Sequence, residues 1–273
     1  MPEANSFNPA PITLTIAGSD SGGGAGIQAD IKAMSANGAF AASVITAVTA
    51  QNTCAVNAVF PIPVEVVAQQ IDTVLSDLNV AAIKVGMLFS PELVKTVATC
   101  LTNYKGLIVL DPVMVAKSGD TLVEQSAVDA IIKHMLPLAD LITPNLPEAA
   151  ILLGTQTIED QTKQAQALIE LGANNVLLKG GHGQGQICTD ILALNGGEFI
   201  NYTTPRIATK NTHGTGCTYS SAISAFLAHG SSLQDAVAKA HQYLHQAIVH
   251  SQRLTVGTGH GPVHHFHKYW IDK

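Results

Sequence analysis

The segment that most constrains how this chain can fold runs from Lys210 to Ser221 and reads Lys-Asn-Thr-His-Gly-Thr-Gly-Cys-Thr-Tyr-Ser-Ser. Gly214 and Gly216 stand two residues apart among hydroxyl side chains, and apolar residues at helical spacing follow at once. This pattern predicts a small-residue loop that leads into a helix. The first N–H groups of a helix and the positive end of its dipole bind anions, and glycines let a phosphate approach the backbone closely. We therefore predict a phosphate site at this helix start.

Cys217 falls in the first turn of the predicted helix. The field at a helix N-terminus favours a thiolate, so a cysteine in this place can serve as a base or nucleophile of low pKa. The alternative is a buried structural cysteine that packs behind the tight turn. The local pattern leaves both interpretations open.

Composition places the chain among well-packed globular proteins. Its 273 residues are 47% hydrophobic and only 12% charged, and the formal net charge is −6. This acidic balance argues against nucleic acid or an anionic membrane as the main partner. No apolar run reaches the roughly 20 residues that span a bilayer, and no signal peptide is evident at the N-terminus. Four cysteines stand far apart, which favours reduced thiols and a cytoplasmic location.

Strands and helices alternate along the chain, which predicts a single α/β domain with a mostly parallel central sheet covered by helices on both faces. We place this domain at residues 12–273, after a flexible tail at 1–11. Its first strand leads into the glycine-rich turn 18–26 and a helix that stops at Asn37-Gly38. The turn does not complete a dinucleotide fingerprint, because Ile27 occupies the place of the third glycine. A nicotinamide-binding role is therefore disfavoured.

Polar residues at predicted turns and strand ends are candidates for binding a small molecule. Asp20 and Asp30 flank the glycine-rich turn, where carboxylates suit hydrogen bonds to a polar ligand, although Asp20 also suits a helix cap. Gln51 follows the predicted strand 43–48, at the crevice in which open α/β sheets bind ligands; a plain turn amide is equally compatible. Met87 suits an apolar wall for a ring, although a core methionine is the commoner outcome.

A second set of candidates suits Mg²⁺ and phosphate. Asp111 directly follows an apolar strand, a place from which carboxylates hold Mg²⁺ near phosphates. Asn145 and Glu148 lie three apart at a predicted helix start, so they suit either a hydrated Mg²⁺ or a capping pair. Lys179, at the end of a further strand, either touches a phosphate or is solvated. The histidines that crowd the C-terminal tail do not have the spacing of a tetrahedral zinc site.

Eight segments, in a kept order, carry a family resemblance together. They are Ala17-Gly-Ser-Asp-Ser-Gly-Gly-Gly-Ala-Gly-Ile-Gln-Ala-Asp30, Thr49-Ala-Gln-Asn-Thr53, Lys84-Val-Gly-Met-Leu88, Asp111-Pro-Val-Met-Val-Ala-Lys-Ser-Gly-Asp120, Thr143-Pro-Asn-Leu-Pro-Glu148, Lys179-Gly-Gly-His182, Asn211-Thr-His-Gly-Thr-Gly-Cys217 and Gly259-His-Gly-Pro-Val-His-His-Phe-His267. The chain thereby resembles the hydroxymethylpyrimidine/phosphomethylpyrimidine kinases of thiamine biosynthesis, within the ribokinase-like superfamily. The resemblance covers nearly the whole chain.

The resemblance implies a ribokinase-like fold and phosphorylation of 4-amino-5-hydroxymethyl-2-methylpyrimidine (HMP), then of its monophosphate, with ATP and Mg²⁺. Cys217 would occupy the place where most ribokinase-like enzymes have an aspartate base. The other implied roles are an anion hole at Gly214, Thr215, Gly216 and Cys217; Mg²⁺ and phosphates at Asp111, Asn145 and Glu148; the nucleotide near Lys179; the aminopyrimidine edge at Gln51; and the ring among Gly18, Asp30, Met87 and Val113.

Two positions depart from the family pattern. Ser21-Gly22 stands where many members have Pro-Ser, which affects loop stiffness more than chemistry, and Asn211 stands where an aspartate is often found. Lys117 and the turn Ser118-Gly119 are hypothesised to form a lid because they are polar and contain glycine.

Two other functions remain open at this point. A pyridoxal kinase shares the implied fold, and residues near Gln51 and Met87 would decide between the two rings. A non-catalytic pyrimidine-binding sensor is the second alternative, against which the candidate metal, anion and base positions all hold competent residues. No pattern in the chain sets the oligomeric state; a homodimer is our expectation.

Overall fold

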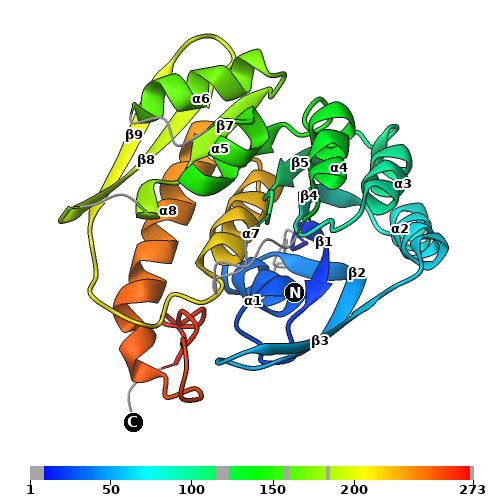
Figure 1. Ribbon diagram of the computed structural model, residues 1–273. Coiled ribbons are helices and arrows are strands. Elements are labelled where there is room, and N and C mark those ends of the chain that lie inside the picture. The colour runs from blue at the N-terminus through cyan, green and yellow to red at the C-terminus, as the bar shows by residue number, and fades with distance from the viewer. Residues whose placement is uncertain (1–8, 115–122, 156–159, 183–184, 271–273) are drawn as a thin grey trace, which may run out of the picture.

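The computed structural model describes residues 9–114, 123–155, 160–182 and 185–270, so the hypothesised lid at 117–119 and most of the tail 1–11 lie outside it. Its strands are β1 (Ile12–Ser19), β2 (Phe40–Gln51), β3 (Val56–Pro61), β4 (Val80–Val85), β5 (Leu107–Leu110), β6 (Leu141–Ile142), β7 (Asn175–Leu178), β8 (Ile187–Leu194) and β9 (Phe199–Pro205). They form one sheet in the order β3-β2-β1-β4-β5-β6-β7-β8-β9. Figure 1 shows β3 and β9 at opposite ends of this sheet.

The middle of the sheet is parallel and its two edges are antiparallel. The strands from β2 through β1, β4, β5 and β6 to β7 pair in parallel. β3 adds antiparallel to β2 at one edge, and β8 and β9 add antiparallel at the other. The mostly parallel sheet predicted from the sequence is therefore confirmed. β2 extends beyond the predicted 43–48 because its last residues pair with β3.

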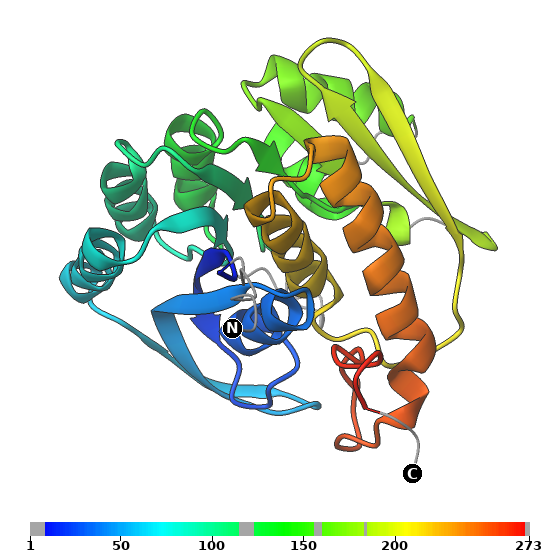
Figure 2. The same ribbon diagram turned by 180° about the vertical axis from the view of Figure 1, so that it is seen from behind.

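Helices cover both faces of the sheet (Figures 1 and 2). They are α1 (Gly26–Ala36), α2 (Val64–Asp77), α3 (Pro91–Leu101), α4 (Gln125–Ala130), α5 (Leu146–Leu153), α6 (Gln161–Glu170), α7 (Thr215–Ala228) and α8 (Leu233–Val249). α7 packs between α1 and α8, and the apolar side chains of these three helices share one core cluster. The pairs α2–α3, α3–α4 and α5–α6 belong to the other face, over the larger cluster.

Local sequence explains these elements. β1 is buried along nearly its whole length, as expected for a strand with helices over both faces. α1 ends at Ala36, and Gly38 takes a φ of +83°, so the predicted stop at Asn37-Gly38 is confirmed. Within the described residues, no helix is long and apolar enough to cross a membrane.

The parallel middle of the sheet sets the position of the candidate site. The carboxyl ends of parallel strands lie at the same edge of a sheet, where α/β proteins bind ligands. At this edge Asp20 follows β1, Asp111 follows β5 and Lys179 follows β7. α7 begins beside the same edge, because its first turn lies next to Asp111 and Lys179.

Candidate active site

The start of α7 is the predicted glycine loop, and its geometry requires glycine. Gly214 is the N-cap residue with a φ of +74°, and a Cβ there would collide with the carbonyl oxygen of Gly24. The Thr215 hydroxyl donates to the carbonyl of Thr212 at 2.6 Å, which steadies the turn. The first N–H groups of a helix have no partner within the helix, so those of the first turn face outward as donors. The loop and helix start are confirmed, and anion binding stays a prediction.

Gly216 lies directly over a buried ion pair. Lys179 Nζ is 2.8 Å from Asp111 Oδ1, and the two side chains are 13% and 2% exposed. A Cβ on Gly216 would lie 3.2 Å from Lys179 Nζ and 3.5 Å from Asp111 Oδ2, so the missing side chain lets the first turn of α7 approach the pair closely. Lys179 is therefore not a solvated lysine. The structure instead brings a cation, a carboxylate and the N-terminus of a helix to one point.

Asp111 is held as a carboxylate by neighbours from three elements. Besides Lys179, the Thr143 hydroxyl donates to Oδ1 at 3.1 Å and the Ser220 hydroxyl reaches Oδ2 at 3.4 Å. Burial opposes ionisation, but the charges of Lys179 and Lys84 outweigh it and lower the pKa of Asp111 below its usual value. Asp111 is thus an anionic oxygen donor at the end of β5.

Asn145 and Glu148 form the capping pair that the spacing allowed. The Asn145 side chain accepts from the Glu148 N–H at 2.9 Å, and the Glu148 carboxylate accepts from the Asn145 N–H at 2.9 Å. Burial raises the pKa of Glu148 to about 7; the Lys179 charge opposes this rise and the Asp111 charge adds to it. Glu148 is therefore a carboxyl that lacks full compensation by positive charge. Its role as a Mg²⁺ ligand stays a prediction.

The donor set at this point fits Mg²⁺ bound together with phosphate, and not a metal held by protein alone. Within the described ranges, no group of three His, Cys, Asp or Glu side chains is placed to hold a metal ion. Mg²⁺, however, is usually held by one or two carboxylates, several waters and substrate phosphates. Asp111 and Glu148 supply two buried carboxyls whose charges interact, an arrangement that fits a cation bound nearby.

Cys217 carries a thiol and not the expected low-pKa thiolate. Burial raises its pKa to about 11; Lys84 opposes this rise, and the charges of Asp30 and Asp111 add to it. A backbone hydrogen bond from Gly26 favours the thiolate but does not outweigh burial. Of the two interpretations that the sequence left open, the low-pKa thiolate is contradicted, because desolvation and two carboxylates outweigh the helix field.

Asp30 belongs to a closed polar cluster beneath Cys217. Its carboxylate accepts from Lys84 Nζ at 3.0 and 2.9 Å, from the Thr15 hydroxyl at 2.6 Å and from the Ser221 hydroxyl at 2.7 Å. Asp30 and Lys84 are both 0% exposed. A carboxylate offers about four acceptor positions, and these bonds use them all. The predicted contact between Asp30 and a substrate ring therefore finds no support in this geometry.

The remaining ring-binding candidates come from β1, from the end of β2 and from the segments that follow β4 and β5. Gly18, in β1, is next to Met87: a Cβ on Gly18 would lie 3.1 Å from the Met87 methyl carbon. Met87 and Val113 are half-buried, and Val113 donates its N–H to the Asp111 carbonyl at 2.8 Å. Gln51 is the half-buried last residue of β2. Their contacts with a ring stay predictions.

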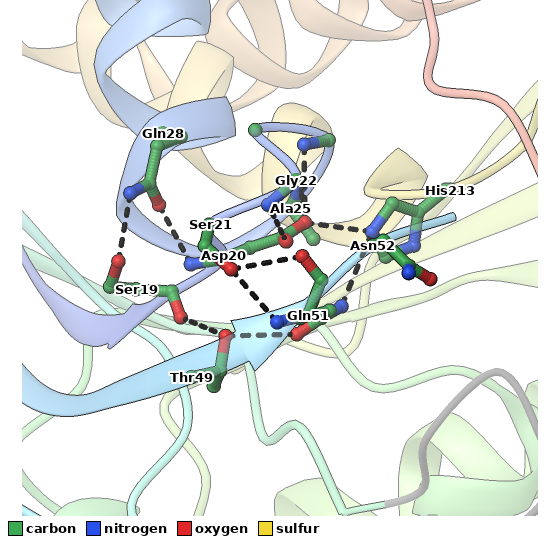
Figure 3. Close-up of polar contacts among 12 residues, drawn as sticks. Ser19, Asp20, Ser21, Gly22, Ala25, Gln28, Thr49, Gln51, Asn52 and His213 are labelled. Carbon is green, nitrogen blue, oxygen red and sulfur yellow. Dashed lines mark hydrogen bonds and ion pairs between the residues drawn. The ribbon is translucent and has the colours of Figure 1, made fainter. Parts of the chain in front are cut away.

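Sequence reasoning missed the partners of two polar groups. Lys84 stands in the otherwise apolar strand β4, and a lysine inside such a strand was the available signal for a buried ion pair. His213 Nε2 lies 2.8 Å from Asp20 Oδ2 and joins the glycine-rich turn to the loop before α7 (Figure 3). No local pattern indicated this second pair.

Comparison with known proteins agrees with this geometry. The family model described as phosphomethylpyrimidine kinase matches residues 20–264. The hydroxymethylpyrimidine/phosphomethylpyrimidine kinase of Rhizobium meliloti (strain 1021) is 51% identical over 96% of this chain and 99% of its own length. Among solved structures, the phosphomethylpyrimidine kinase from Clostridium difficile 630 has a TM-score of 0.77 at 41% identity, covering 87% of this chain and 99% of its own. The pyridoxal kinase from Staphylococcus aureus, solved with AMP-PCP and pyridoxal, has a TM-score of 0.87 at 32% identity, covering 97% of each chain.

Proposed function

The chain belongs to the phosphomethylpyrimidine kinase family, and we propose that it transfers the γ-phosphoryl group of ATP to the hydroxymethyl group of HMP and then phosphorylates the resulting monophosphate. The observation that carries the proposal is the close approach of the α7 N-terminus, at Gly216, to the ion pair of Lys179 and Asp111, with Cys217 next in the chain. Phosphoryl transfer needs mainly positioning and stabilisation of negative charge, and this arrangement offers both.

In the first step the substrate hydroxyl oxygen forms a bond to the γ-phosphorus while the bond from that phosphorus to the bridging oxygen of ADP breaks. The N–H groups at Gly214–Cys217 donate to the phosphoryl oxygens, and Lys179 lies 3.2 Å from the Cβ position of Gly216, within reach of the same group. The hydroxyl proton passes to the Cys217 sulfur. Because burial raises the pKa of this thiol to about 11, the thiolate that accepts the proton is scarce at neutral pH, and the rate should rise with pH.

Mg²⁺ belongs to the proposal with the ATP phosphates. Asp111 and Glu148 would hold it, directly or through water, while Asn145 keeps the Glu148 carboxylate in place through the capping box. When bound, the ion would neutralise charge that develops on the phosphate oxygens. ATP as the phosphoryl donor is supported by the AMP-PCP complex of the pyridoxal kinase from Staphylococcus aureus.

Pyridoxal is the competing substrate, because that similar structure holds pyridoxal as well as AMP-PCP. We favour the pyrimidine, since the family match and the identity of 51% both belong to pyrimidine kinases. Gln51 supports this choice, because a side-chain amide matches the adjacent donor and acceptor of an aminopyrimidine edge.

The test is ADP release by the purified chain with Mg-ATP and, in parallel, HMP, its monophosphate and pyridoxal. The proposal expects turnover of both pyrimidines, with pyridoxal slow. Turnover of pyridoxal alone would assign a pyridoxal kinase, and tight pyrimidine binding without turnover would assign a sensor. Cys217→Ala should abolish the rise of rate with pH; unchanged turnover in this variant would refute its role as base.

We further propose a homodimer that forms through the edge strand β3. Val56, Val59 and Phe60 expose 48%, 51% and 68% of their surface there, and Val48 of the neighbouring β2 exposes 44%. An exposed apolar edge of this kind usually pairs or is covered. Phe60→Lys should give a monomer by analytical ultracentrifugation, and a wild-type monomer would contradict the proposal. A cytoplasmic location is proposed from the four free cysteines.

A further inference from the structure

The Asp20 carboxylate is the centre of a cluster that joins the glycine-rich turn to the loop before α7 (Figure 3). Its Oδ1 accepts from the Gly22 N–H at 2.8 Å, and its Oδ2 accepts from the N–H groups of Gly24 and Ala25 at 3.1 and 2.8 Å. His213 Nε2 lies 2.8 Å from the same Oδ2. Burial opposes ionisation of Asp20, but hydrogen bonds from His213 and Ala25 outweigh it, so the pKa of this carboxyl is lowered. Asp20 is therefore a carboxylate that only accepts hydrogen bonds.

The ionised Asp20 carboxylate implies that His213 Nε2 carries a proton. A carboxylate has no proton to donate, so His213 Nε2 must be the donor in this pair. Gln51 Nε2, which lies 3.5 Å from the same ring nitrogen, then meets a second donor and not an acceptor. With the amide in this orientation, the contact between the two side chains is unfavourable.

The oxygen of the Gln51 amide is also badly paired, because it faces an acceptor. The Thr49 hydroxyl lies 2.8 Å from the Ser19 carbonyl and donates its single proton there. Gln51 Oε1, 3.3 Å from the same hydroxyl, therefore meets an acceptor. Turning the amide by half a rotation makes its NH₂ group a donor to the Thr49 hydroxyl, and it places Oε1 where it shares the single His213 Nε2 proton with Asp20 instead of facing it as a second donor. The oxygen and nitrogen of a side-chain amide are assigned from such a network, and this network favours the turned orientation.

We infer that His213 and Thr49 hold the Gln51 amide with its carbonyl oxygen toward His213 and its NH₂ group toward Thr49. His213 is then a positioning residue: it acts on a ligand through Gln51. The Gln51 backbone is fixed independently, because the Ser21 hydroxyl accepts from its N–H at 2.8 Å and donates to its carbonyl at 2.9 Å. His213 and Thr49 fix only the orientation of the side-chain amide.

His213 is held both through its backbone and through its ring. Its backbone N–H donates to the Gly261 carbonyl at 3.0 Å, which ties the loop to the C-terminal tail. On the other side the ring lies against the glycine-rich turn, where a Cβ on Gly24 would collide with the ring carbon Cδ2. A ring packed in this way keeps its Nε2 on Asp20 and Gln51.

This inference rests on the proposed function, because its consequence is a preference between pyrimidines. The 4-amino group of HMP donates and the adjacent ring nitrogen accepts. A fixed Gln51 carbonyl and NH₂ group match that order, using the second lone pair and the second proton of the amide. The 4-oxo analogue of HMP shows the reverse order, acceptor at the oxygen and donor at the ring N–H. An amide that is free to turn would accept both compounds.

The experiment measures binding of HMP and of its 4-oxo analogue by calorimetry in the wild type, Thr49→Val, His213→Phe and the double variant. The wild type should prefer HMP by about 100-fold or more. In the double variant, the ratio of the affinities for HMP and the 4-oxo analogue should fall at least about tenfold, mainly because the 4-oxo analogue binds more tightly. Thr49→Val, which keeps the size of the side chain, should lose part of the preference, and it serves as the test if His213→Phe does not fold.

Lys32→Met is the matched control, since Lys32 Nζ donates to the Gly23 carbonyl at 2.8 Å on the same turn without touching Gln51. This variant should keep the preference of the wild type. An unchanged preference in the double variant, or an equal loss in Lys32→Met, would overturn the inference while leaving the proposed function intact. A wild type that binds neither pyrimidine would instead overturn the proposed function and the inference together.

Discussion

Replacing Gly216 by alanine separates the stability of α7 from the chemistry at its N-terminus. Glycine within a helix costs roughly 0.5–1 kcal/mol relative to alanine, so Gly216→Ala should leave the melting temperature unchanged or raise it by about 2–4 °C. The new methyl group would lie 3.2 Å from Lys179 Nζ, and the flexible end of a lysine can move by the few tenths of an ångström required. The fold should therefore be retained.

The catalytic activity of Gly216→Ala should fall, although its stability is kept. The methyl group of Gly216→Ala occupies the space above Lys179 and Asp111, in which the transferred phosphoryl group must lie if the proposed mechanism holds. Loss of one such stabilising contact costs about 10²–10³-fold in kcat in comparable sites. The assay is ADP release with HMP at saturating Mg-ATP, alongside thermal unfolding. A variant that folds normally and keeps kcat within about threefold would refute the placement of the phosphoryl group.

Two other glycines provide the contrast. Gly214 has a φ of +74°, and a side chain there would meet the Gly24 carbonyl oxygen, so Gly214→Ala should lose stability as well as activity. Gly196 lies at the hairpin between β8 and β9, where an added Cβ meets no atom within 4 Å, and Gly196→Ala should change neither. If all three variants behaved alike, the argument from space at Gly216 would fail.

Three further predictions concern buried ionisable groups. The folded-state pKa of Glu148 is raised from 4.5 to about 7, so this carboxyl should make stability fall by about 3 kcal/mol as pH rises between those values; Glu148→Gln should flatten this part of a melting-temperature profile. Lys84→Met should cost about 3–5 kcal/mol in chemical denaturation, because Asp30 stays buried without its cation, and Lys84→Met/Asp30→Leu should recover most of the loss. Iodoacetamide at neutral pH should label exposed Cys54, whose pKa is lowered by hydrogen bonds from Thr258 and Thr53, well before Cys217, and equal labelling in peptide mass spectra would contradict the raised pKa of Cys217.

Local patterns predicted much of the fold, because strands, caps and turns are set by neighbouring residues. The capping pair at Asn145 and Glu148 and the helix stop at Asn37-Gly38 are confirmed in the structure. The ion pairs were not predicted, because their partners lie far apart in the chain: Lys84 and Asp30 are 54 residues apart. The pKa of Cys217 was missed for a related reason: burial raises it most, and the carboxylates that add to the rise, Asp30 in α1 and Asp111 after β5, lie far away in the chain.

The charged side chains beneath α7 determine what a phosphoryl group would need in order to bind at the start of this helix. Lys84 already neutralises Asp30, and Lys179 already neutralises Asp111. Each lysine is thus already paired with a carboxylate, and ionised Glu148 makes the net charge of these five side chains negative above a pH of about 7. In the proposed mechanism, a phosphoryl group beside Gly216 therefore needs the N–H groups of α7 and a cation that arrives with it, in addition to Lys179. On the proposed function, this need would account for the burial of the Asp111 and Glu148 carboxyls despite the cost of their desolvation.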